Sequence, residues 1–290
     1  MGHRDVGILH PGDMGASVAA QAVAGGAEVR WLPGGRSAAT LRRAAGAGLL
    51  AAGDLRELAE SCEVVLSVCP PAAALDVARE VARAGFRGVY VDANAVSPQL
   101  MARIAELLAA GGATVVDGGI TGPPPREAGT TRLYLSGDAP AVARVAGLFT
   151  GTALAPFPLD GPIGRASALK LAFASYNKIT YALAAQACAL ADGHGVLDEL
   201  LDLAAGALPH TPLAATGRLA GAGAKAWRWE PEMAEIARAC AQAGLPSGFA
   251  EAAAETFRRW EAHKDDTTVT GARLIADLRT AERHEGPGTL

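Results

Sequence analysis

The chain begins its first structural unit with Asp5-Val-Gly-Ile-Leu-His-Pro-Gly-Asp-Met-Gly15. The short apolar run Val6–Leu9 is typical of a buried strand, and a turn with Gly12 and Gly15 follows it. A helix-forming run, Ala16–Ala24, comes next and ends at two glycines. A strand, a glycine turn and a helix in this order present backbone N–H groups and a helix N-terminus to a phosphate. We therefore predict a nucleotide-binding unit that begins at residue 5.

The composition excludes several classes of protein. Half of the 290 residues are hydrophobic, 5% are aromatic and 35 are glycine, so the core has to be built from aliphatic and small side chains. The net charge of −4 gives no basic surface for nucleic acid. The four cysteines show no C-x-x-C spacing, which indicates reduced thiols and no metal site. We find no signal peptide and no apolar run long enough to span a membrane, and we expect a cytoplasmic protein.

Up to about residue 160, strand-like runs alternate with helical runs, which predicts βαβ units around a mostly parallel sheet with helices on both faces. The predicted strands are Val6–Leu9, Glu28–Leu32, Val64–Cys69, Val89–Asp92, Ala113–Asp117, Arg132–Ser136 and Ala153–Pro156. After residue 160 we expect only helices, at Ile163–Asp192, Val196–Ala207, Pro231–Ala243, Ser247–Ala262 and Thr270–Arg283. We predict an α/β Rossmann-type N-terminal domain, residues 1–160, followed by an all-α C-terminal domain, residues 161–290.

The turn after the first strand departs at one position from the dinucleotide fingerprint G-x-G-x-x-G. In that fingerprint the first glycine makes the turn, the second lets the pyrophosphate approach, and the third lets the helix pack on the strand. Gly12 and Gly15 supply the last two glycines, whereas His10 occupies the first position. The place of the turn at the head of a series of βα units favours a dinucleotide site, and an ordinary βα turn is the alternative. His10 could contact the cofactor or serve only to pack the turn.

The end of the second predicted strand indicates which dinucleotide is bound. NAD-specific sites carry an acidic residue there, which accepts a hydrogen bond from the ribose 2′-hydroxyl. This chain has no acid at that point and has Arg36 and Ser37 instead. A guanidinium and a hydroxyl suit a 2′-phosphate, so we predict NADP(H) as the cofactor. The alternative is a solvated loop arginine.

Lys170 is the candidate general acid/base. It is one of only four lysines, and it lies in the small and apolar stretch Ala166-Ser-Ala-Leu-Lys-Leu-Ala-Phe173. Partial desolvation favours the neutral amine, which can accept a proton, whereas an arginine cannot. The residues alone leave open a second possibility, in which the lysine stem lies along an apolar helix and its head remains in water.

Five motifs between residue 5 and about residue 178 resemble, in order and spacing, the β-hydroxyacid dehydrogenase superfamily, which includes 6-phosphogluconate dehydrogenases, 3-hydroxyisobutyrate dehydrogenases and imine reductases. His10-Pro-Gly-Asp-Met-Gly15 resembles its glycine turn, and Val68-Cys-Pro70 resembles its strand that ends in proline near the nicotinamide ribose. Asp92-Ala-Asn-Ala-Val-Ser-Pro98 and Asp117-Gly-Gly-Ile-Thr-Gly-Pro123 resemble its Asp-x-Ser-Thr-x-x-Pro loop and its substrate loop. Gly161-x-x-Gly164 followed by Lys170 resembles its lysine block, and the helical remainder is similar to the subgroup whose C-terminal domain is of unknown function.

The resemblance implies an NAD(P)-dependent oxidoreductase that interconverts a β-hydroxy acid, or a related alcohol, and its carbonyl compound, with Lys170 as general acid/base. Together with the reasoning above, it gives as cofactor contacts His10, Gly12, Asp13, Met14, Arg36, Ser37, Cys69, Pro70 and Asn94. The substrate contacts that it implies are Asn94, Thr121, Gly122, Asn177 and Lys178. It also implies a small acidic substrate and a homodimer formed through the long helix.

Departures from the superfamily pattern keep other functions open. Ala174 replaces an asparagine four residues after the lysine, and Pro123 replaces a glycine and so removes one backbone N–H. Asn177 lies on roughly the same helical face as Lys170, about 10 Å further along, and Lys178 could supply charge to an acid group. The alternatives are an NADPH-dependent imine reductase, against which Lys170 counts, and a non-catalytic NADP-binding protein.

Overall fold

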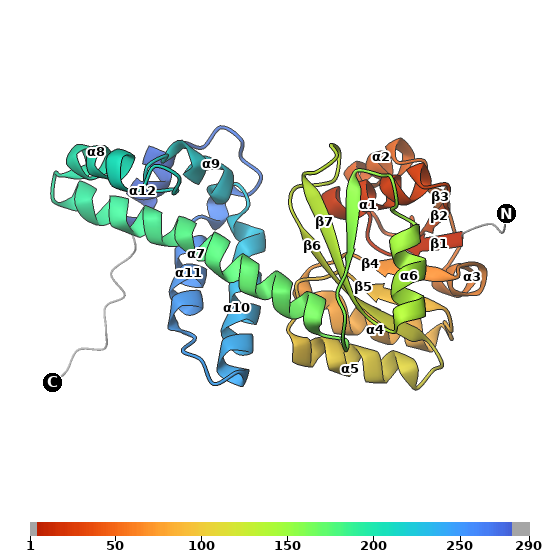
Figure 1. The fold of residues 1–290 in the computed structure, drawn as a ribbon. Helices are drawn as coiled ribbons and strands as arrows, with labels where there is room; N and C mark the ends of the chain where they lie inside the picture. Colours follow the sequence, from red (N-terminus) through yellow and green to blue (C-terminus); the bar gives the residue numbers. More distant parts are fainter. Residues whose placement is uncertain (1–4, 280–290) are drawn as a thin grey trace, which may run out of the picture. The chain divides into compact units, whose positions relative to one another are not determined.

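The computed structural model describes residues 5–279, which form two compact units that divide between Leu171 and Ala172 (Figure 1). The first unit is an α/β domain and the second is helical, which confirms the predicted fold class. One helix, α7 (Arg165–Gly193), runs from the first unit into the second. We predicted a domain boundary at residue 160, before this helix, whereas the two units divide inside it.

One eight-stranded sheet of order β3-β2-β1-β4-β5-β6-β7-β8 forms the centre of the first unit. Its strands are β1 (Asp5–Ile8), β2 (Glu28–Trp31), β3 (Leu50–Ala51), β4 (Val64–Ser67), β5 (Val89–Asp92), β6 (Thr114–Thr121), β7 (Thr131–Gly137) and β8 (Leu154–Pro158). Neighbouring strands are parallel from β3 to β6, whereas β7 runs antiparallel to β6 and parallel to β8. The carboxyl ends of β1 to β6 therefore meet at one edge of the sheet, where ligands of such sheets bind.

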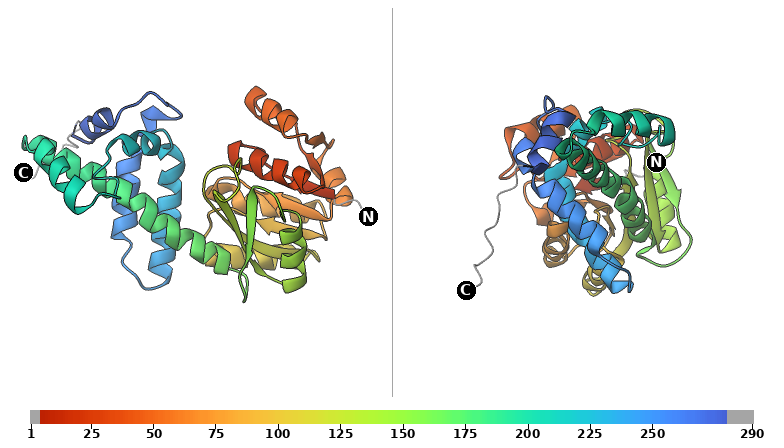
Figure 2. Two further views of the ribbon diagram at one scale, coloured as in Figure 1. Left: turned by 45° about the horizontal axis from the view of Figure 1, so that its top comes forward. Right: turned by 90° about the vertical axis from the view of Figure 1, so that its left-hand side faces the viewer.

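Helices cover both faces of this sheet (Figure 2). They are α1 (Asp13–Ala24), α2 (Ala38–Gly46), α3 (Leu55–Ser61), α4 (Ala74–Arg83) after the 3-10 turn η1 (Pro71–Ala73), α5 (Pro98–Ala109) and α6 (Ala139–Gly147). Successive strand residues belong to two different apolar clusters, one on each face of the sheet. Val64 and Leu66 belong to the first cluster, and Val65 belongs to the second. The first cluster packs α1, α2 and α6 on the sheet, and the second packs α3, α4 and α5. Burial of this aliphatic surface supplies most of the stability of such a layer.

Strand β6 is longer than predicted, because it continues through Gly118 and Gly119 to Thr121, where the sequence predicts a loop. A Cβ on Gly118 would lie 3.1 Å from the Cβ of Ala93. A Cβ on Gly119 would lie 2.7 Å from the carbonyl oxygen of Ala166 in α7. The two glycines therefore admit close neighbours on a strand rather than form a turn. Thr121 is the last residue of that strand.

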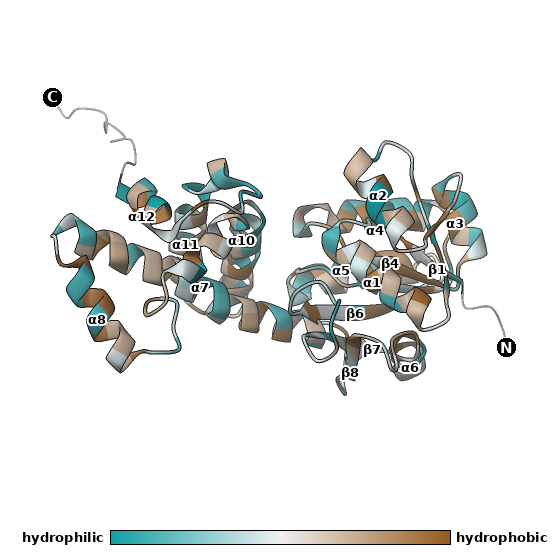
Figure 3. Ribbon diagram, turned by 90° about the horizontal axis from the view of Figure 1, so that it is seen from above, coloured by the Kyte–Doolittle hydropathy of each residue, from teal (hydrophilic) through white to brown (hydrophobic). Residues whose placement is uncertain are grey.

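The elements described in the second unit are helices, and hydrophobic and hydrophilic residues alternate along them (Figure 3). After α7 come α8 (Leu197–Ala207), α9 (Gly217–Gly223), α10 (Ala226–Gln242), α11 (Gly248–Arg258), the 3-10 turn η2 (Glu261–His263) and α12 (Gly271–Arg279). We did not predict α9, and we placed the start of α10 at Pro231, whereas the helix begins at Ala226 and contains Pro231 in its interior. The predicted residues 280–283 of the last helix lie outside the described residues.

An aromatic series forms part of the core of the second unit. The ring of Trp229 in α10 lies edge-on to Tyr181 and to Phe257, with centroid distances of 5.6 and 5.4 Å. Phe257 in turn lies 5.9 Å from Trp260. Such pairs add to the free energy of burial, because the positive edge of one ring meets the negative face of another.

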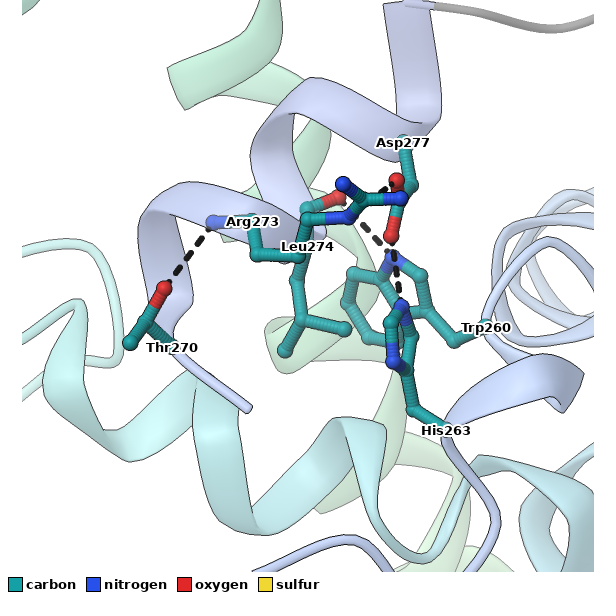
Figure 4. A network of polar contacts seen from close by, with 6 residues as sticks. All are labelled: Trp260, His263, Thr270, Arg273, Leu274 and Asp277. Carbon is teal, nitrogen blue, oxygen red and sulfur yellow. Dashed lines mark hydrogen bonds and ion pairs between the residues drawn. The ribbon is translucent and has the colours of Figure 1, made fainter. Parts of the chain in front are cut away.

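A network of polar contacts holds α12 in place, as Figure 4 shows. The indole N–H of Trp260 donates to the carbonyl oxygen of Leu274 at 3.0 Å. Asp277 accepts from His263 Nε2 at 2.6 Å and pairs with Arg273 Nε at 2.9 Å. These contacts lie within the second unit.

Among the residues from 5 to 279, no helix has the length and apolar character needed to cross a membrane.

Candidate functional site

The turn between β1 and α1 has the geometry of a phosphate site. Gly12 is the N-cap residue of α1, and because it has no side chain it supplies no side-chain cap to this helix. A Cβ placed on Gly12 would meet no atom within 4 Å, so open space lies over the turn. A Cβ on Gly15 would lie 2.2 Å from the carbonyl oxygen of His10, so only glycine lets the helix approach the strand this closely. The turn therefore fits a pyrophosphate bound at a helix N-terminus.

His10 and Arg36 lie beside each other after β1 and β2. The His10 Nδ1 and the Arg36 Nε atoms are buried and have no hydrogen-bond partner among the residues that the structure describes. Burial, and then the positive charge of Arg36, lower the pKa of His10 to about 4. His10 is therefore neutral at physiological pH. The Arg36 Nη2 atom donates to the carbonyl oxygen of Leu9 at 3.2 Å, which places the guanidinium at the carboxyl end of β1.

Ser37 begins the helix that follows β2. Its hydroxyl accepts a hydrogen bond from the backbone N–H of Thr40 at 3.3 Å and so caps α2. Arg36 and Ser37 therefore stand together at a helix N-terminus, where the backbone dipoles favour an anion. Met14, which we predicted as a cofactor contact, packs against the apolar cluster under α1.

Asn94 joins the ends of β4 and β5. Its Oδ1 atom accepts from the backbone N–H of Cys69 at 2.5 Å, and its Nδ2 group donates to Ser67 Oγ at 3.1 Å. The side chain is buried, and these bonds fix the turn that contains Cys69 and Pro70. Burial raises the pKa of the Cys69 thiol to about 12, so this group is a neutral thiol at physiological pH. The amide thus holds the ends of β4 and β5 together, and its contact with a ligand stays a prediction.

Lys170 lies near the start of α7, and its side chain is half-buried against β6. Its Nζ group donates to the carbonyl oxygen of Ile120 at 2.5 Å. Gly119 leaves room for this approach, since a Cβ there would lie 3.2 Å from the Lys170 Cβ. Because β6 is parallel to β5, its carboxyl end lies at the same sheet edge as the turn after β1. The amine, Thr121 and the glycine turn therefore face the same edge of the sheet.

Asp117 anchors the helix that carries Lys170. Its buried carboxylate accepts from the backbone N–H groups of Gly164 and Ser167 at 2.9 and 3.0 Å. It also accepts from the hydroxyls of Ser136 and Ser167 at 2.9 and 2.6 Å. The first N–H groups of a helix have no partner inside the helix, so Asp117 caps α7 from a distant strand. Sequence reasoning missed this role, because the partners lie up to 50 residues away.

Asn177 and Lys178 belong to the second unit. The Asn177 side chain is exposed, whereas Lys178 is buried and forms an ion pair with Glu232 in α10. The Lys178 ammonium also lies 5.2 Å from the ring centroid of Trp229. Its charge is thus compensated within the helical unit, and its contact with an acidic substrate stays a prediction.

No group of three or more metal-binding side chains occurs between residues 5 and 279.

Comparison with known families shows to which family this chain is related. Residues 5–157 match the family described as the NAD binding domain of 6-phosphogluconate dehydrogenase. The chain belongs to this family. Residues 191–260 match a domain of unknown function (DUF1932), which confirms the predicted subgroup of this 6-phosphogluconate dehydrogenase-like superfamily.

Individual relatives of this 6-phosphogluconate dehydrogenase-like chain cover it to different extents. An uncharacterized 28.5 kDa protein of Methanothermus fervidus is 29% identical over 177 residues, which span 61% of this chain and 66% of that protein. The structure of Mycobacterium tuberculosis 3-hydroxyisobutyrate dehydrogenase with L-serine is 19% identical, with a TM-score of 0.75 over 96% of this chain and 100% of that one. A reductive aminase from Aspergillus terreus in complex with NADPH and ethyl levulinate is 20% identical, with a TM-score of 0.55 over 96% and 100%. These two solved structures share the fold.

Proposed function

We propose that this protein is an NADP(H)-dependent oxidoreductase that interconverts a β-hydroxy acid, or a related alcohol, and its carbonyl compound. The observation that carries the proposal is the place of Lys170, whose amine lies 2.5 Å from the carbonyl oxygen of Ile120 at the carboxyl end of β6. That sheet edge also carries the Gly12 turn, and ligands of open α/β sheets bind beyond it. When bound there, the nicotinamide supplies the hydride acceptor or donor.

Lys170 moves the proton that accompanies hydride transfer. In the oxidative direction its neutral amine accepts the hydroxyl proton of the substrate, and in the reductive direction its ammonium returns that proton to the carbonyl oxygen. The Thr121 hydroxyl and the Gly122 backbone follow Ile120 directly and are proposed to hold the substrate. We propose Asn94, Asn177 and Lys178 as further substrate contacts and an acidic group on the substrate.

The proposed preference for NADP(H) depends on Arg36, whose guanidinium lies beside the N-terminus of α2. Arg36→Ala is expected to raise the Kd for NADPH about 10-fold or more, because one charge-assisted hydrogen bond is lost. The Kd for NADH should change little, since NADH has no 2′-phosphate. Fluorescence titration with both nucleotides measures the two constants. Unchanged affinity for NADPH would show that another group binds the 2′-phosphate.

A substrate screen tests the proposed reaction. Hydroxy acids, simple alcohols, ketones and cyclic imines are offered with NADP(H) and with NAD(H), and the absorbance band of the reduced nicotinamide reports turnover. Oxidation of a β-hydroxy acid with NADP supports the proposal. Reduction of a cyclic imine but of no ketone would favour the imine reductase instead. Tight binding of NADPH without turnover of any compound would favour a non-catalytic protein.

We also propose a homodimer formed through α7. Apolar side chains that are each more than half exposed follow one face of this helix at spacings of three and seven residues: Phe173, Tyr176, Leu183 and Leu190. This spacing is that of a helix face that packs against another helix. Light scattering at micromolar concentration should give about twice the 29.4 kDa mass of the chain. A mass of one chain would remove the dimer.

We propose a cytoplasmic location on the basis of the cysteines. All four thiols are free, and two of them, Cys62 and Cys188, are buried. Reduced thiols without disulfides are typical of proteins from a reducing compartment.

A further inference from the structure

The loop between β6 and β7, residues 122–130, places an arginine at the start of α1. The Arg126 Nη2 atom lies 3.0 Å from the Asp13 Oδ1 atom. Asp13 is the first residue of α1 and follows Gly12, the residue over which the turn is open. Arg126 is 72% exposed in its side chain. The guanidinium therefore stands in solvent at the mouth of the glycine turn.

Several contacts hold this loop over α1. The loop begins at Gly122, whose φ is +120°, and a Cβ there would lie 2.3 Å from the carbonyl oxygen of Thr130. The Gln21 side chain of α1 donates to the carbonyl oxygen of Pro125 at 3.0 Å. Three consecutive prolines, residues 123–125, restrict the backbone directly before Arg126. The backbone that carries Arg126 is thus held at α1 before any ligand binds, and the bond to Asp13 orients the exposed guanidinium, which lowers the entropy lost on binding.

The negative charges expected at this turn favour a positively charged side chain beside it. The carboxylate of Asp13 lies at the helix N-terminus where the pyrophosphate of a dinucleotide would bind, and two like charges at short range repel each other. Arg126 compensates this charge. A guanidinium has five N–H donors in a planar arrangement that matches phosphate oxygens, so a bond to Asp13 is compatible with a bond to phosphate.

We propose that Arg126 is a ligand of the cofactor pyrophosphate and that Asp13 holds it in position. The inference rests on the proposed dinucleotide function and adds a side chain to a phosphate site otherwise made of backbone N–H groups. NADPH and NADH both carry the pyrophosphate, so Arg126 serves both nucleotides. Arg36, by contrast, serves only the 2′-phosphate.

The test compares three probes on the full-length protein by isothermal titration calorimetry: NADPH, NADH and adenosine 2′-monophosphate, which has a 2′-phosphate but no pyrophosphate. Arg126→Ala should raise the Kd for NADPH and for NADH by a similar factor, about 10-fold at low salt, where charge interactions are least screened. The Kd for adenosine 2′-monophosphate should stay within about 2-fold, because its phosphate is proposed to bind at Arg36 after β2, and charge interactions between exposed groups weaken with distance. Arg36→Ala should give the reverse pattern, with NADPH and adenosine 2′-monophosphate weakened and NADH little changed.

Arg144→Ala is the matched control, because Arg144 forms an exposed ion pair with Glu63, the residue before β4 at the opposite edge of the sheet. It removes one positive charge from the same unit and should leave all three constants unchanged. Thermal unfolding confirms that each variant is folded.

Asp13→Asn in the Arg126→Ala background separates direct binding from charge compensation. If Arg126 binds the pyrophosphate, this second substitution recovers only part of the lost NADPH affinity. Full recovery would mean that Arg126 only neutralises Asp13, and it would overturn the proposal. So would an Arg126→Ala protein that binds both dinucleotides like the wild type while Arg36→Ala still weakens NADPH. A wild-type protein that binds neither dinucleotide would instead refute the proposed function, and this assignment with it.

Discussion

Lys170→Ala is expected to lower kcat for the best hydroxy acid of the screen by about 100-fold or more, the usual effect of losing a positioned proton-transfer group. The Kd for NADPH should stay close to that of the wild type, because the Lys170 amine is bonded to the Ile120 carbonyl group at the end of β6, whereas the phosphates are proposed to bind at the turn after β1. Steady-state kinetics and nucleotide titration measure the two quantities on the same preparation. A large fall in kcat with an intact cofactor site would assign Lys170 to the chemical step.

Two further variants sharpen this experiment. Lys170→Arg keeps a positive charge but cannot give up its proton at working pH, so it should be as inactive as the alanine variant. Lys225→Ala removes an exposed lysine at the start of α10 and should leave kcat unchanged. A small primary amine added to Lys170→Ala should restore part of the rate, because it can transfer the proton in place of the side chain. Near-normal turnover of Lys170→Ala would exclude the lysine from the mechanism.

The order of the elements could be predicted, because strands and helices leave local patterns in the sequence. The run Val64–Ser67 is buried on both faces and is apolar almost throughout, as expected for an inner parallel strand. Strand β6 shows where the local pattern fails. Gly118 and Gly119 resemble a turn by composition, and only the close approach of Ala93 and Ala166 explains them as strand residues.

Helix α9 was missed for a related reason. Three glycines, Gly217, Gly221 and Gly223, lower the helix propensity of its seven residues. A Cβ on Gly223 would lie 2.6 Å from the side chain of Leu274, so the packing of α12 against this helix selects glycine there. Tertiary contact thus overrides propensity, and no local pattern reports it.

The candidate site likewise contains two kinds of residue, those whose partners are close in the sequence and those whose partners are distant. Gly12, Gly15 and Ser37 act on their own turn or on the helix that follows, and the sequence pointed to each of them. The ligand contact of Asn94 stays a prediction, whereas the bonds of its amide to Ser67 and Cys69, 27 and 25 residues away, were not predicted. The role of a residue whose partners are distant in the sequence can be recognised only when the fold is known.

The roles of Asp117 and Arg126 were not predicted for the same reason. The partners of Asp117 lie up to 50 residues away, and Arg126 reaches a carboxylate 113 residues away. The sequence therefore pointed to the edge of the sheet where we propose the site, whereas the way that its residues are held became visible only in the structure.

Asp92, at the end of β5, is the second residue with a large expected effect. Its carboxyl group is fully buried, and Oδ1 accepts from the backbone N–H of Asn94 at 3.1 Å. Its Oδ2 atom has no hydrogen-bond partner within the described residues. Burial, with a smaller contribution from the charge of Asp117, raises the pKa of Asp92 from 3.8 to about 7, although hydrogen bonds from Asn94 act in the opposite direction.

The raised pKa makes the stability of the protein depend on pH. The folded state binds the Asp92 proton more tightly than the unfolded state does, so this stabilisation is fully present below pH 3.8 and is lost as the pH rises to about 7. Asp92→Asn cannot ionise and escapes the loss. Its free energy of unfolding relative to the wild type should therefore increase by roughly 3 kcal/mol between pH 5 and pH 8, at about 1.4 kcal/mol per pH unit. Urea unfolding at pH 5, 6, 7 and 8 measures this difference.

Asp76→Asn is the control for this measurement. Asp76 is exposed on α4 and pairs with Arg79, so its removal should shift the free energy of unfolding by less than about 1 kcal/mol at any of these pH values. The asparagine at position 92 still has to bury an amide where the carboxyl group stood, so the test lies in the change of the difference with pH and not in its value at one pH. Curves for Asp92→Asn and the wild type that stay parallel from pH 5 to pH 8 would show that Asp92 is already ionised at pH 5. The Asn94 N–H bond would then be strong enough to offset burial of the charge.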